Sequence, residues 1–426
     1  MKRMLSTEIS QYPGERVVVQ GWVHRVRELG AVKFLLVRDR QGVIQCVLDK
    51  EAVELNNEDV VEITGTVKSD PRAPMGAEVQ VDEVTVISKS YDTPPIEINQ
   101  KKLTASLDTV LDHRALSLRN PRVRAAMRIE SELVYAFREG LRKHGFTEIH
   151  TPKIVSAGAE GGSALFPVTY FDRKAYLAQS PQFYKQIMVG VFERVYETAH
   201  VFRAEEHNTS RHLNEYLSLD FEMGFIQNEE TVMDMEVTLL RFMMDHITQN
   251  CADDLALYDV KVPEIDPPRM PLSEAREILA QKFGKSYDPD DDLDPEGERL
   301  ICNIVKEQTG SEMVFLTEYP IKKRPMYTMP HETKPGVTRS FDLLYKGLEI
   351  TTGGQRIHDY EMLKRNIENS GYDPEDFQYY LEAFKHGMPP HGGLAIGAER
   401  LTARLLDFNN VREATPFPRD ISRLVP

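Results

Sequence analysis

The sequence is poor in the residues that bind structural zinc, form disulfides or cross membranes. Only three of its 426 residues are cysteines, Cys46, Cys251 and Cys302, and none belongs to a C-x-x-C pair. This argues against a zinc knuckle and a disulfide scaffold. No apolar run approaches the roughly 20 residues of a membrane span, and the N-terminus, MKRMLSTEIS, lacks the apolar block of a signal peptide. We therefore expect a cytoplasmic protein without membrane attachment.

Two common nucleotide-binding motifs are also missing. There is no G-x-x-x-x-G-K-[ST] and no strand followed by G-x-G-x-x-G, so neither a P-loop nor a dinucleotide fold is supported. The formal net charge of −15 argues against a basic coat that grips nucleic acid anywhere, although a local basic groove stays compatible with it. With 41% hydrophobic and 28% charged residues, the chain is globular and long enough for two or three domains.

The hydrophobic periodicity divides the chain. Residues 1–95 contain about five short runs of alternating apolar and polar residues, separated by Gly, Asp and Pro turns, which predict a small closed β-barrel. Residues 96–120 are predicted to be a linker or hinge. Residues 121–426 open with a long amphipathic helix and then mix strands and helices without β-α-β alternation, which predicts an antiparallel sheet flanked by helices. The predicted fold class is α+β.

One stretch, residues 202–225, concentrates charge within a predicted hairpin. Arg203 follows an apolar strand and Arg211 follows a polar turn, so two guanidinium groups can meet at the mouth of the hairpin and bind phosphate oxygens. The return strand places an aromatic residue and acids on one face, at Tyr216, Ser218, Asp220 and Glu222. By itself this pattern fits a surface hairpin with ordinary salt bridges equally well.

Two later stretches carry related features. FDLLYKGLEITTGGQRIH places Asp342 and Glu349 on one face of neighbouring strands, and its paired glycines indicate a close backbone approach before Arg356. GGLAIGAERLTARLL places Arg400 at the start of a helix, where a guanidinium can lie against a flat ring.

These three stretches, with FTEIHTPKIV and its Pro152, resemble in order the defining motifs of class II aminoacyl-tRNA synthetases. The resemblance covers nearly the whole chain and extends to the aspartyl, asparaginyl and lysyl branch, whose N-terminal anticodon-binding barrel has the OB fold. The chain lacks the large insertion of most bacterial aspartyl enzymes and ends in FPRDISRLVP, so it looks like the archaeal-type aspartyl form. The second domain is accordingly expected to be a class II catalytic domain.

The resemblance implies ATP as a substrate and Mg²⁺ as a cofactor. Arg203, Arg400 and Glu349 are implied to be catalytic, with Arg203 on the α-phosphate. Tyr216 and Arg400 would sandwich the adenine. The implied ATP-binding set is Arg203, Glu205, Arg211, His212, Tyr216, Glu349 and Arg400, and the implied metal set is Asp342, Glu349 and Thr352. Carboxylate and phosphate oxygens are the ligands that magnesium prefers.

The resemblance also implies a site for L-aspartate. Its members are Glu160, Ser163, Gln182, Lys185, Asp220 and Arg356. Two cations, Lys185 and Arg356, suit a carboxylate and reject a neutral amide. Lys185 is therefore the residue that favours aspartate over asparagine. Without the resemblance it would be interpreted as a surface charge on an amphipathic helix. An asparaginyl-tRNA synthetase is the alternative. A non-catalytic RNA-binding paralogue is less favoured, because the three implied catalytic residues are present.

The implied macromolecular partners are tRNA(Asp) and a second copy of the chain. Arg27, Phe34, Gln45 and Glu78 are implied to read the anticodon, whereas without the resemblance Phe34 would be interpreted as barrel core and Arg27 as a solvated charge. In archaeal-type enzymes a His and a Pro of the barrel are associated with relaxed tRNA choice, and His24 and Pro74 stand at similar places. We therefore expect tRNA(Asn) to be charged as well. The helix from residue 122 and the segment around Pro152 resemble a homodimer interface.

Overall fold

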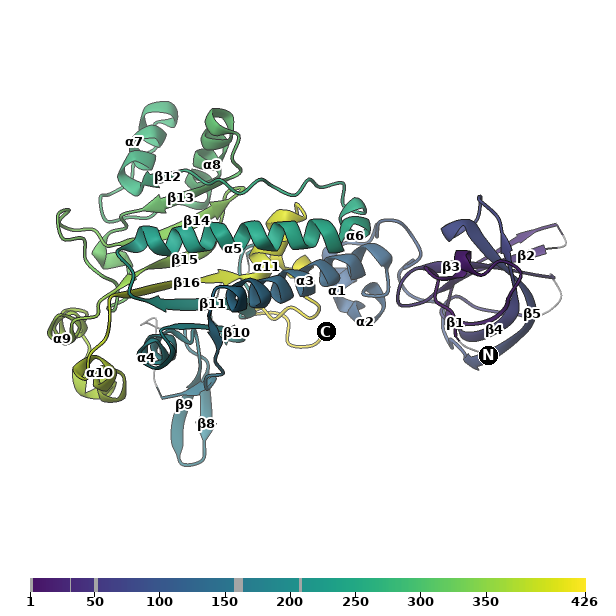
Figure 1. Ribbon diagram of the computed structural model, residues 1–426, viewed down its shortest axis with the longest axis horizontal. Coiled ribbons are helices and arrows are strands. Elements are labelled where there is room, and N and C mark those ends of the chain that lie inside the picture. The colour runs from purple at the N-terminus through teal and green to yellow at the C-terminus, as the bar shows by residue number, and fades with distance from the viewer. Residues whose placement is uncertain (1–2, 31, 50–52, 157–163, 207–208) are drawn as a thin grey trace. The chain divides into compact units, whose positions relative to one another are not determined.

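The computed structural model describes residues 3–30, 32–49, 53–156, 164–206 and 209–426 (Figure 1). The chain forms two compact units, Met1–Pro121 and Arg122–Pro426. Within the described residues, none of the helices has both the length and the apolar character that crossing a membrane requires.

The first unit is a closed five-stranded barrel in the order β1-β2-β3-β5-β4. Its strands are β1 (Arg16–Leu29), β2 (Val32–Arg38), β3 (Val43–Asp49), β4 (Val60–Ser69) and β5 (Ala77–Ser88), with short 3-10 helices η1 (Ile9–Gln11) and η2 (Pro74–Gly76). The alternation buries every second residue of β2, such as Leu35 and Val37, in the barrel interior. Gly21 of β1 lies so close to the backbone of β2 that any Cβ there would be 2.3 Å from the Arg38 carbonyl oxygen, so this position requires glycine.

Residues 96–120, predicted as a linker, hold two short helices, α1 (Leu107–Asp112) and α2 (Arg114–Ser117). The Asn120 amide donates to the Ile98 and Gln100 carbonyl oxygens at 2.9 and 2.7 Å. Arg119 forms an ion pair with Glu58 of the barrel at 2.9 Å. The segment therefore belongs to the first unit through side-chain contacts that its sequence did not indicate.

The second unit is built on an eight-stranded sheet in the order β12-β13-β14-β15-β16-β11-β10-β6. Its strands are β6 (Thr147–Glu148), β10 (Arg194–Phe202), β11 (Glu215–Gly224), β12 (Arg269–Pro271), β13 (Met313–Thr317), β14 (Ser340–Tyr345), β15 (Leu348–Arg356) and β16 (His391–Gly397). The expected antiparallel pairing holds from β13 to β10, but the two edge pairs, β6 with β10 and β12 with β13, are parallel. The α+β class is confirmed.

Helices cover this sheet in groups (Figure 1). The long helices α3 (Pro121–Lys143) and α5 (Glu229–Asn250) share the largest apolar core with the central strands. The predicted amphipathic helix from residue 121 is therefore present. A second core joins α7 (Leu272–Phe283) and α8 (Pro295–Thr309) to β13, and a third joins α4 (Gln182–Phe192), α9 (Tyr360–Asn369) and α10 (Gln378–Lys385). The remaining elements are α6 (Ala252–Ala256), α11 (Ala398–Leu405), η3 (Ile321–Lys323), η4 (Pro374–Phe377), η5 (Val411–Ala414) and the small sheet of β7 (Ile154–Val155), β9 (Arg173–Leu177) and β8 (Pro167–Tyr170).

The acidic stretch around residue 290 leads directly into helix α8. The Asp294 carboxylate accepts a hydrogen bond from the Gly297 amide at 2.8 Å and caps α8, which has Pro295 at its first position. Gly310, with φ of +82°, ends the helix in the left-handed conformation. The end of the acidic run is therefore the first turn of α8, and Glu298 lies in it.

Candidate active site

The hairpin of β10 and β11 fixes the position of Arg203. The Asn214 side-chain amide donates to the carbonyl oxygens of Arg203 and Glu205 at 2.7 and 3.0 Å, and the Arg203 amide donates to the Asn214 carbonyl at 2.9 Å. The Arg203 guanidinium lies 5.9 Å from the centre of the Tyr216 ring. The loop is thus closed at its base, with a cation and an aromatic ring at its mouth.

A cavity at this mouth gathers the residues implied for ATP. All seven line it, namely Arg203, Glu205, Arg211, His212, Tyr216, Glu349 and Arg400. Thr352, Gly397 and the backbone around Ala395 complete the side toward β15 and β16. Three stretches that are far apart in sequence therefore converge on one cavity.

Arg400 connects these stretches. Its Nη1 donates to the Glu349 carbonyl oxygen at 3.0 Å and lies 3.5 Å from the Glu349 carboxylate, while its Nε donates to the Arg211 carbonyl oxygen at 3.3 Å. Partial burial raises the pKa of Glu349, but the charge of Arg400 and a hydrogen bond from Thr352 outweigh it, so the pKa lies below its ordinary value. Glu349 is therefore ionised in a cavity rich in arginine.

His212 contributes hydrogen bonding without charge. Its Nε2 lies 3.8 Å from the Glu205 carboxylate, and its Nδ1 shares a hydrogen bond with the Thr209 hydroxyl at 2.6 Å. Burial, and then the charge of Arg400, lower the pKa of His212 below its ordinary value of 6.5. Near pH 7 the imidazole is neutral and offers one N–H to a ligand.

The residues implied for the metal lie together. Asp342 and Thr352 face each other across β14 and β15, and the Thr352 hydroxyl donates to the Glu349 carboxylate at 2.8 Å. Arg324 forms an ion pair with Asp342 Oδ2 at 2.8 Å, whereas the buried Asp342 Oδ1 has no hydrogen-bond partner. Burial raises the pKa of Asp342 to about 6, although the charge of Arg324 opposes this.

This oxygen-only set fits magnesium. In the part of the chain that the structure describes, no three His, Cys, Asp or Glu residues are grouped as metal ligands. Magnesium usually takes only one or two protein carboxylates and completes its shell with water and substrate phosphates. Two carboxylates, one with a free oxygen, meet that requirement.

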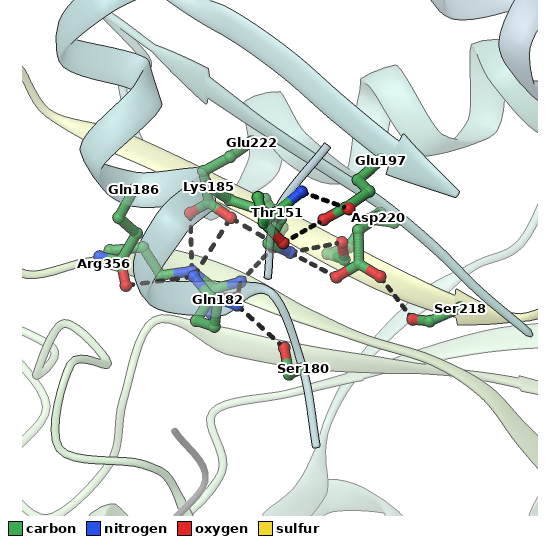
Figure 2. A network of polar contacts seen from close by, with 12 residues as sticks. Thr151, Ser180, Gln182, Lys185, Gln186, Glu197, Ser218, Asp220, Glu222 and Arg356 are labelled. Carbon is green, nitrogen blue, oxygen red and sulfur yellow. Dashed lines mark hydrogen bonds and ion pairs between the residues drawn. The ribbon is translucent and has the colours of Figure 1, made fainter. Parts of the chain in front are cut away.

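Four of the residues implied for the amino acid, Gln182, Lys185, Asp220 and Arg356, form a buried network beside this cavity (Figure 2). Lys185, on α4, is fully buried, and its ammonium donates to Asp220 at 2.8 Å and to the Leu394 carbonyl at 3.1 Å. It also lies 3.5 Å from Glu222. Lys185 is therefore an interior charge, which excludes its interpretation as a surface lysine.

Arg356 approaches the same carboxylates from β15. Its Nε donates to Glu222 at 2.9 Å, and its Nη2 donates to the Gly393 carbonyl at 2.9 Å and to the Gln182 side-chain oxygen at 3.4 Å. A Cβ on Gly393 would lie 2.4 Å from Glu222 Oε2. Gly393 thus makes room for the Glu222 carboxylate between strands β11 and β16.

The network is charge-balanced. The sequence indicated two convergent cations, but the structure adds a carboxylate for each, because Asp220 pairs with Lys185 and Glu222 pairs with Arg356. Burial raises the pKa of Glu222, but the charges of Arg356 and Lys185 outweigh it and hold the pKa below its ordinary value. A site of two cations and two carboxylates can bind a zwitterion by exchange of partners.

The residues implied for the anticodon lie on paired strands of the barrel, where Arg27 is exposed, Phe34 and Gln45 are partly exposed and Glu78 is buried. Arg27 pairs with Phe34 across β1 and β2, and Gln45 pairs with Glu78 across β3 and β5, with a hydrogen bond of 2.9 Å between the last two side chains. Phe34 is partly exposed and lies outside the barrel core, which contradicts its interpretation as a core residue. Arg27, Phe34 and Gln45 therefore present a partly exposed aromatic ring and two polar groups, and the buried Glu78 holds Gln45.

The two residues implied for tRNA discrimination have different surroundings. His24 is buried at an irregularity of β1, and its ring lies 3.4 Å from Arg38, which also forms a two-fold hydrogen bond with Glu58. Pro74 is exposed at the start of η2. His24 therefore has its ring within a buried polar cluster, whereas Pro74 is open to a ligand.

Family comparison agrees with this geometry. The family model described as tRNA synthetases class II (D, K and N) matches residues 106–421, and the model of an OB-fold nucleic acid binding domain matches residues 17–87. The chain belongs to the class II tRNA synthetases. As such it uses ATP to form aminoacyl-tRNA, and tRNA is its partner.

Individual relatives of the synthetase extend over its whole length. It is 52% identical to the aspartate–tRNA(Asp/Asn) ligase of Deinococcus radiodurans, and the alignment covers 100% of this chain and 99% of the relative. It is 50% identical to the ligase of the same name from Thermus thermophilus, with 100% of both chains covered. Among solved structures, the asparaginyl-tRNA synthetase of Pyrococcus horikoshii, with asparaginyl-adenylate, has a TM-score of 0.94 at 32% identity, again covering 100% of both chains.

Several residues of the synthetase site were not among those expected. Glu222 shares the face of Asp220 at a spacing of two, so strand periodicity indicated its orientation but not its pairing. Gln186 and His391 hydrogen bond at 2.9 Å, and the Tyr380 hydroxyl donates to Gln186 at 3.0 Å, without any local sequence signal. Two of the expected residues, Glu160 and Ser163, lie outside the described residues.

Proposed function

We propose that this synthetase activates L-aspartate with ATP and transfers the aspartyl group to tRNA(Asp). The observation that carries the proposal is the fully buried Lys185 ammonium next to Arg356, within a network of matched charge. A buried ammonium and guanidinium can bind the substrate's side-chain carboxylate, whereas a neutral amide would leave them less well compensated. The relatives from Deinococcus radiodurans and Thermus thermophilus, both named as aspartate ligases, support the same choice.

Substrate binding follows from exchange of ion-pair partners. The substrate ammonium takes Asp220 and the Gln182 side-chain oxygen, while its side-chain carboxylate takes Lys185 and Arg356. Each buried charge keeps a partner throughout, which avoids the several kcal/mol (about 3–5) that an unpaired buried charge costs. Glu222 stays behind Arg356 and holds its orientation through the 2.9 Å bond.

The chemistry requires no protein nucleophile. The α-carboxylate of aspartate attacks the α-phosphorus of ATP, diphosphate leaves, and aspartyl-adenylate forms. Arg203 binds the α-phosphate and Glu205 contacts the adenine side. Arg211 and neutral His212 bind the outer phosphates. Tyr216 and Arg400 enclose the adenine ring. The terminal adenosine hydroxyl of tRNA then takes the aspartyl group and AMP leaves. Catalysis is by position and charge neutralisation.

Asp342, Glu349 and Thr352 would hold Mg²⁺ beside the nucleotide. The ion neutralises phosphate charge when it is bound. The free Oδ1 of Asp342 supports this assignment, since Arg324 occupies only the other oxygen.

Amino-acid-dependent exchange of diphosphate into ATP tests the specificity. We expect exchange with aspartate and a rate with asparagine lower by at least about a hundredfold, because the site discriminates through buried charges. The alternative is an asparaginyl-tRNA synthetase, which is favoured by the fold of the Pyrococcus horikoshii enzyme. Exchange with asparagine and none with aspartate would establish that alternative.

We also infer that the enzyme charges tRNA(Asn). His24 and Pro74 and the relatives named for both tRNAs support this. Aminoacylation of each purified tRNA with labelled aspartate is the test, and comparable rates are expected. A rate on tRNA(Asn) thousands of times lower would show that the enzyme is specific for tRNA(Asp).

We further infer a homodimer that acts in the cytoplasm. Along α3, Tyr135 exposes 55% of its surface, and it lines a groove with Phe417, which is also exposed. Exposed aromatic side chains along a groove are typical of an interface. Light scattering after gel filtration is expected to give twice the chain mass of 48.8 kDa.

A further inference from the structure

Helix α8 reaches the ATP cavity through one ion pair. Glu298, in its first turn, is paired with Nη2 of Arg211, and both side chains are largely buried, at 14% and 18% exposure. Arg211 lines the cavity, whereas Glu298 is not among its lining residues. The carboxylate therefore contacts the guanidinium from outside the cavity.

The rest of Arg211 is also held. Its carbonyl oxygen accepts from Arg400 Nε at 3.3 Å, and its amide donates to the Thr209 hydroxyl at 3.2 Å. Glu298 supplies the only side-chain anchor of Arg211 that is found among the described residues, and it binds a single terminal nitrogen. Nε and the other terminal nitrogen keep their donors for a ligand.

Positive charge is concentrated around Arg211, and Glu298 is the carboxylate paired with it. Burial raises the pKa of Glu298 to about 7, although the charge of Arg211 opposes this. Burial, and then the charge of Arg211, lower the pKa of Arg404, so the two guanidinium groups interact. Arg211 also lies beside Arg400, and Arg203 lines the same cavity. Without an anion behind it, the Arg211 side chain would be displaced toward solvent and would have to be ordered again when ATP binds.

The element that carries Glu298 is rigid. The Asp294 cap and the Gly310 terminus define the ends of α8, and its buried residues Ile301 and Val305 pack in the apolar core that includes Val314 of β13. A carboxylate on such a helix has a fixed position relative to the sheet, which a loop residue would not have.

We propose that Glu298 is a positioning residue that holds the Arg211 guanidinium toward the outer phosphates of ATP. The proposal rests on the proposed role of Arg211 and gives α8 a part in nucleotide binding. Glu298 acts through Arg211 and does not touch the nucleotide.

Diphosphate exchange with Glu298→Ala, Glu298→Gln and Arg211→Ala, singly and in the double variant with alanine at both positions, is the test. We expect Glu298→Ala to raise KM for ATP about tenfold, the range for a hydrogen bond to a charged group, with KM for aspartate and the melting temperature unchanged. Glu298→Gln keeps an acceptor and should restore part of the loss. In the Arg211→Ala background, Glu298→Ala should have no further effect. Glu307→Ala, at an exposed glutamate of the same helix, is the control.

Three results would overturn the proposal. Additive effects of Glu298→Ala and Arg211→Ala would show that the two residues act independently. A lower KM for ATP in Glu298→Ala would show that the carboxylate competes with phosphate. Parallel changes in KM for ATP, KM for aspartate and the melting temperature would show that Glu298 only stabilises the fold. Failure of this proposal can be distinguished from an error in the amino-acid assignment. If the substrate were asparagine, Glu298→Ala would still raise KM for ATP, but in exchange reactions that depend on asparagine.

Discussion

At the scale of single residues, the site depends on charges that are buried in matched pairs. Lys185 and Arg356 are each within 3 Å of a carboxylate oxygen, at 2.8 and 2.9 Å, and are almost fully excluded from solvent. Breaking such a pair by removing one partner is strongly destabilising, because the remaining charge stays buried. The same pairs give specificity, because a substrate must replace the interactions that it displaces.

Replacement of Lys185 by methionine tests this directly. The variant keeps most of the side-chain length and loses the ammonium, so Asp220 loses its cationic partner. We expect aspartate-dependent diphosphate exchange to fall at least about a hundredfold, in line with the 2–5 kcal/mol measured when one member of a buried pair is truncated. Lys174→Met, at an exposed lysine of β9, is the control. Unchanged exchange in Lys185→Met would remove the basis of the aspartate assignment.

At the scale of secondary-structure elements, the site depends on how closely β11 and β16 approach. Gly393 faces Phe221 and Glu222 across this pair, and a Cβ there would lie 2.1 Å from the Phe221 carbonyl oxygen. Contacts this short force the backbone to move. The glycines of β15 have a related role, because a Cβ on Gly353 would lie 2.5 Å from the Phe341 ring. These glycines allow neighbouring strands and side chains of the protein to pack closely. The sequence had indicated a close backbone approach without identifying the partner.

Gly393→Ala should therefore separate the strands and displace Glu222 from Arg356. We expect a melting temperature several degrees lower, consistent with an overpacking penalty of about 1–3 kcal/mol. We also expect KM for aspartate to rise more than KM for ATP, because Glu222 belongs to the amino-acid network. Gly190→Ala is the matched control, since its new methyl would meet only the flexible Met388 side chain, at 3.2 Å. Equal effects of the two variants would contradict this account.

Helix α5 carries a buried acid, Glu236, whose protonation affects the stability of the fold. Burial raises the pKa of Glu236 from 4.5 to about 8. Between these values the folded protein keeps a proton that the unfolded chain releases, so the free energy of unfolding falls as the pH rises through this window. Glu236→Gln lacks this titration. Its melting temperature relative to the parent should increase steadily from pH 5 to pH 8.

Thermal unfolding of both proteins at pH 5, 6.5 and 8 measures the effect. Asp245→Asn, at an exposed acid on the same helix, should show a difference from the parent that does not vary with pH in this range. A Glu236→Gln difference that is equally constant would show that Glu236 is ionised in the folded protein.

At the scale of the whole molecule, the residues implied for the anticodon and those of the ATP cavity belong to separate units. The ATP cavity and the charged network lie within Arg122–Pro426, and Arg27, Phe34, Gln45 and Glu78 lie within Met1–Pro121. Variants of the barrel should therefore affect tRNA and leave amino-acid activation intact.

Phe34→Ala tests this separation. Loss of one stacked base costs about 1–3 kcal/mol, so we expect KM for tRNA to rise about tenfold to a hundredfold, with diphosphate exchange unchanged. Ile87→Ala, at an exposed apolar residue of β5, is the control. A tRNA KM that matches the control would show that Phe34 does not contact the anticodon.

Much of this arrangement was predictable from the sequence. Period-two alternation predicted the barrel, and 3.6-residue periodicity predicted α3. Both features depend on local geometry, because side-chain direction follows directly from strand or helix period. The resemblance to class II synthetases implied seven of the residues that line the ATP cavity. The helices of residues 96–120 were missed because helices of six and four residues carry little periodicity. The start of α8 was missed because it lies in an acidic stretch that contains prolines.

The sequence by itself determined the α+β class and which residue types face the site. Only the tertiary structure decided which charges neutralise one another. Glu222 pairs with Arg356, Glu298 with Arg211 and Arg324 with Asp342 across 134, 87 and 18 residues of chain. Such pairs form because burial makes an unpaired charge expensive, and burial depends on how distant elements pack. Local sequence carries no record of that packing.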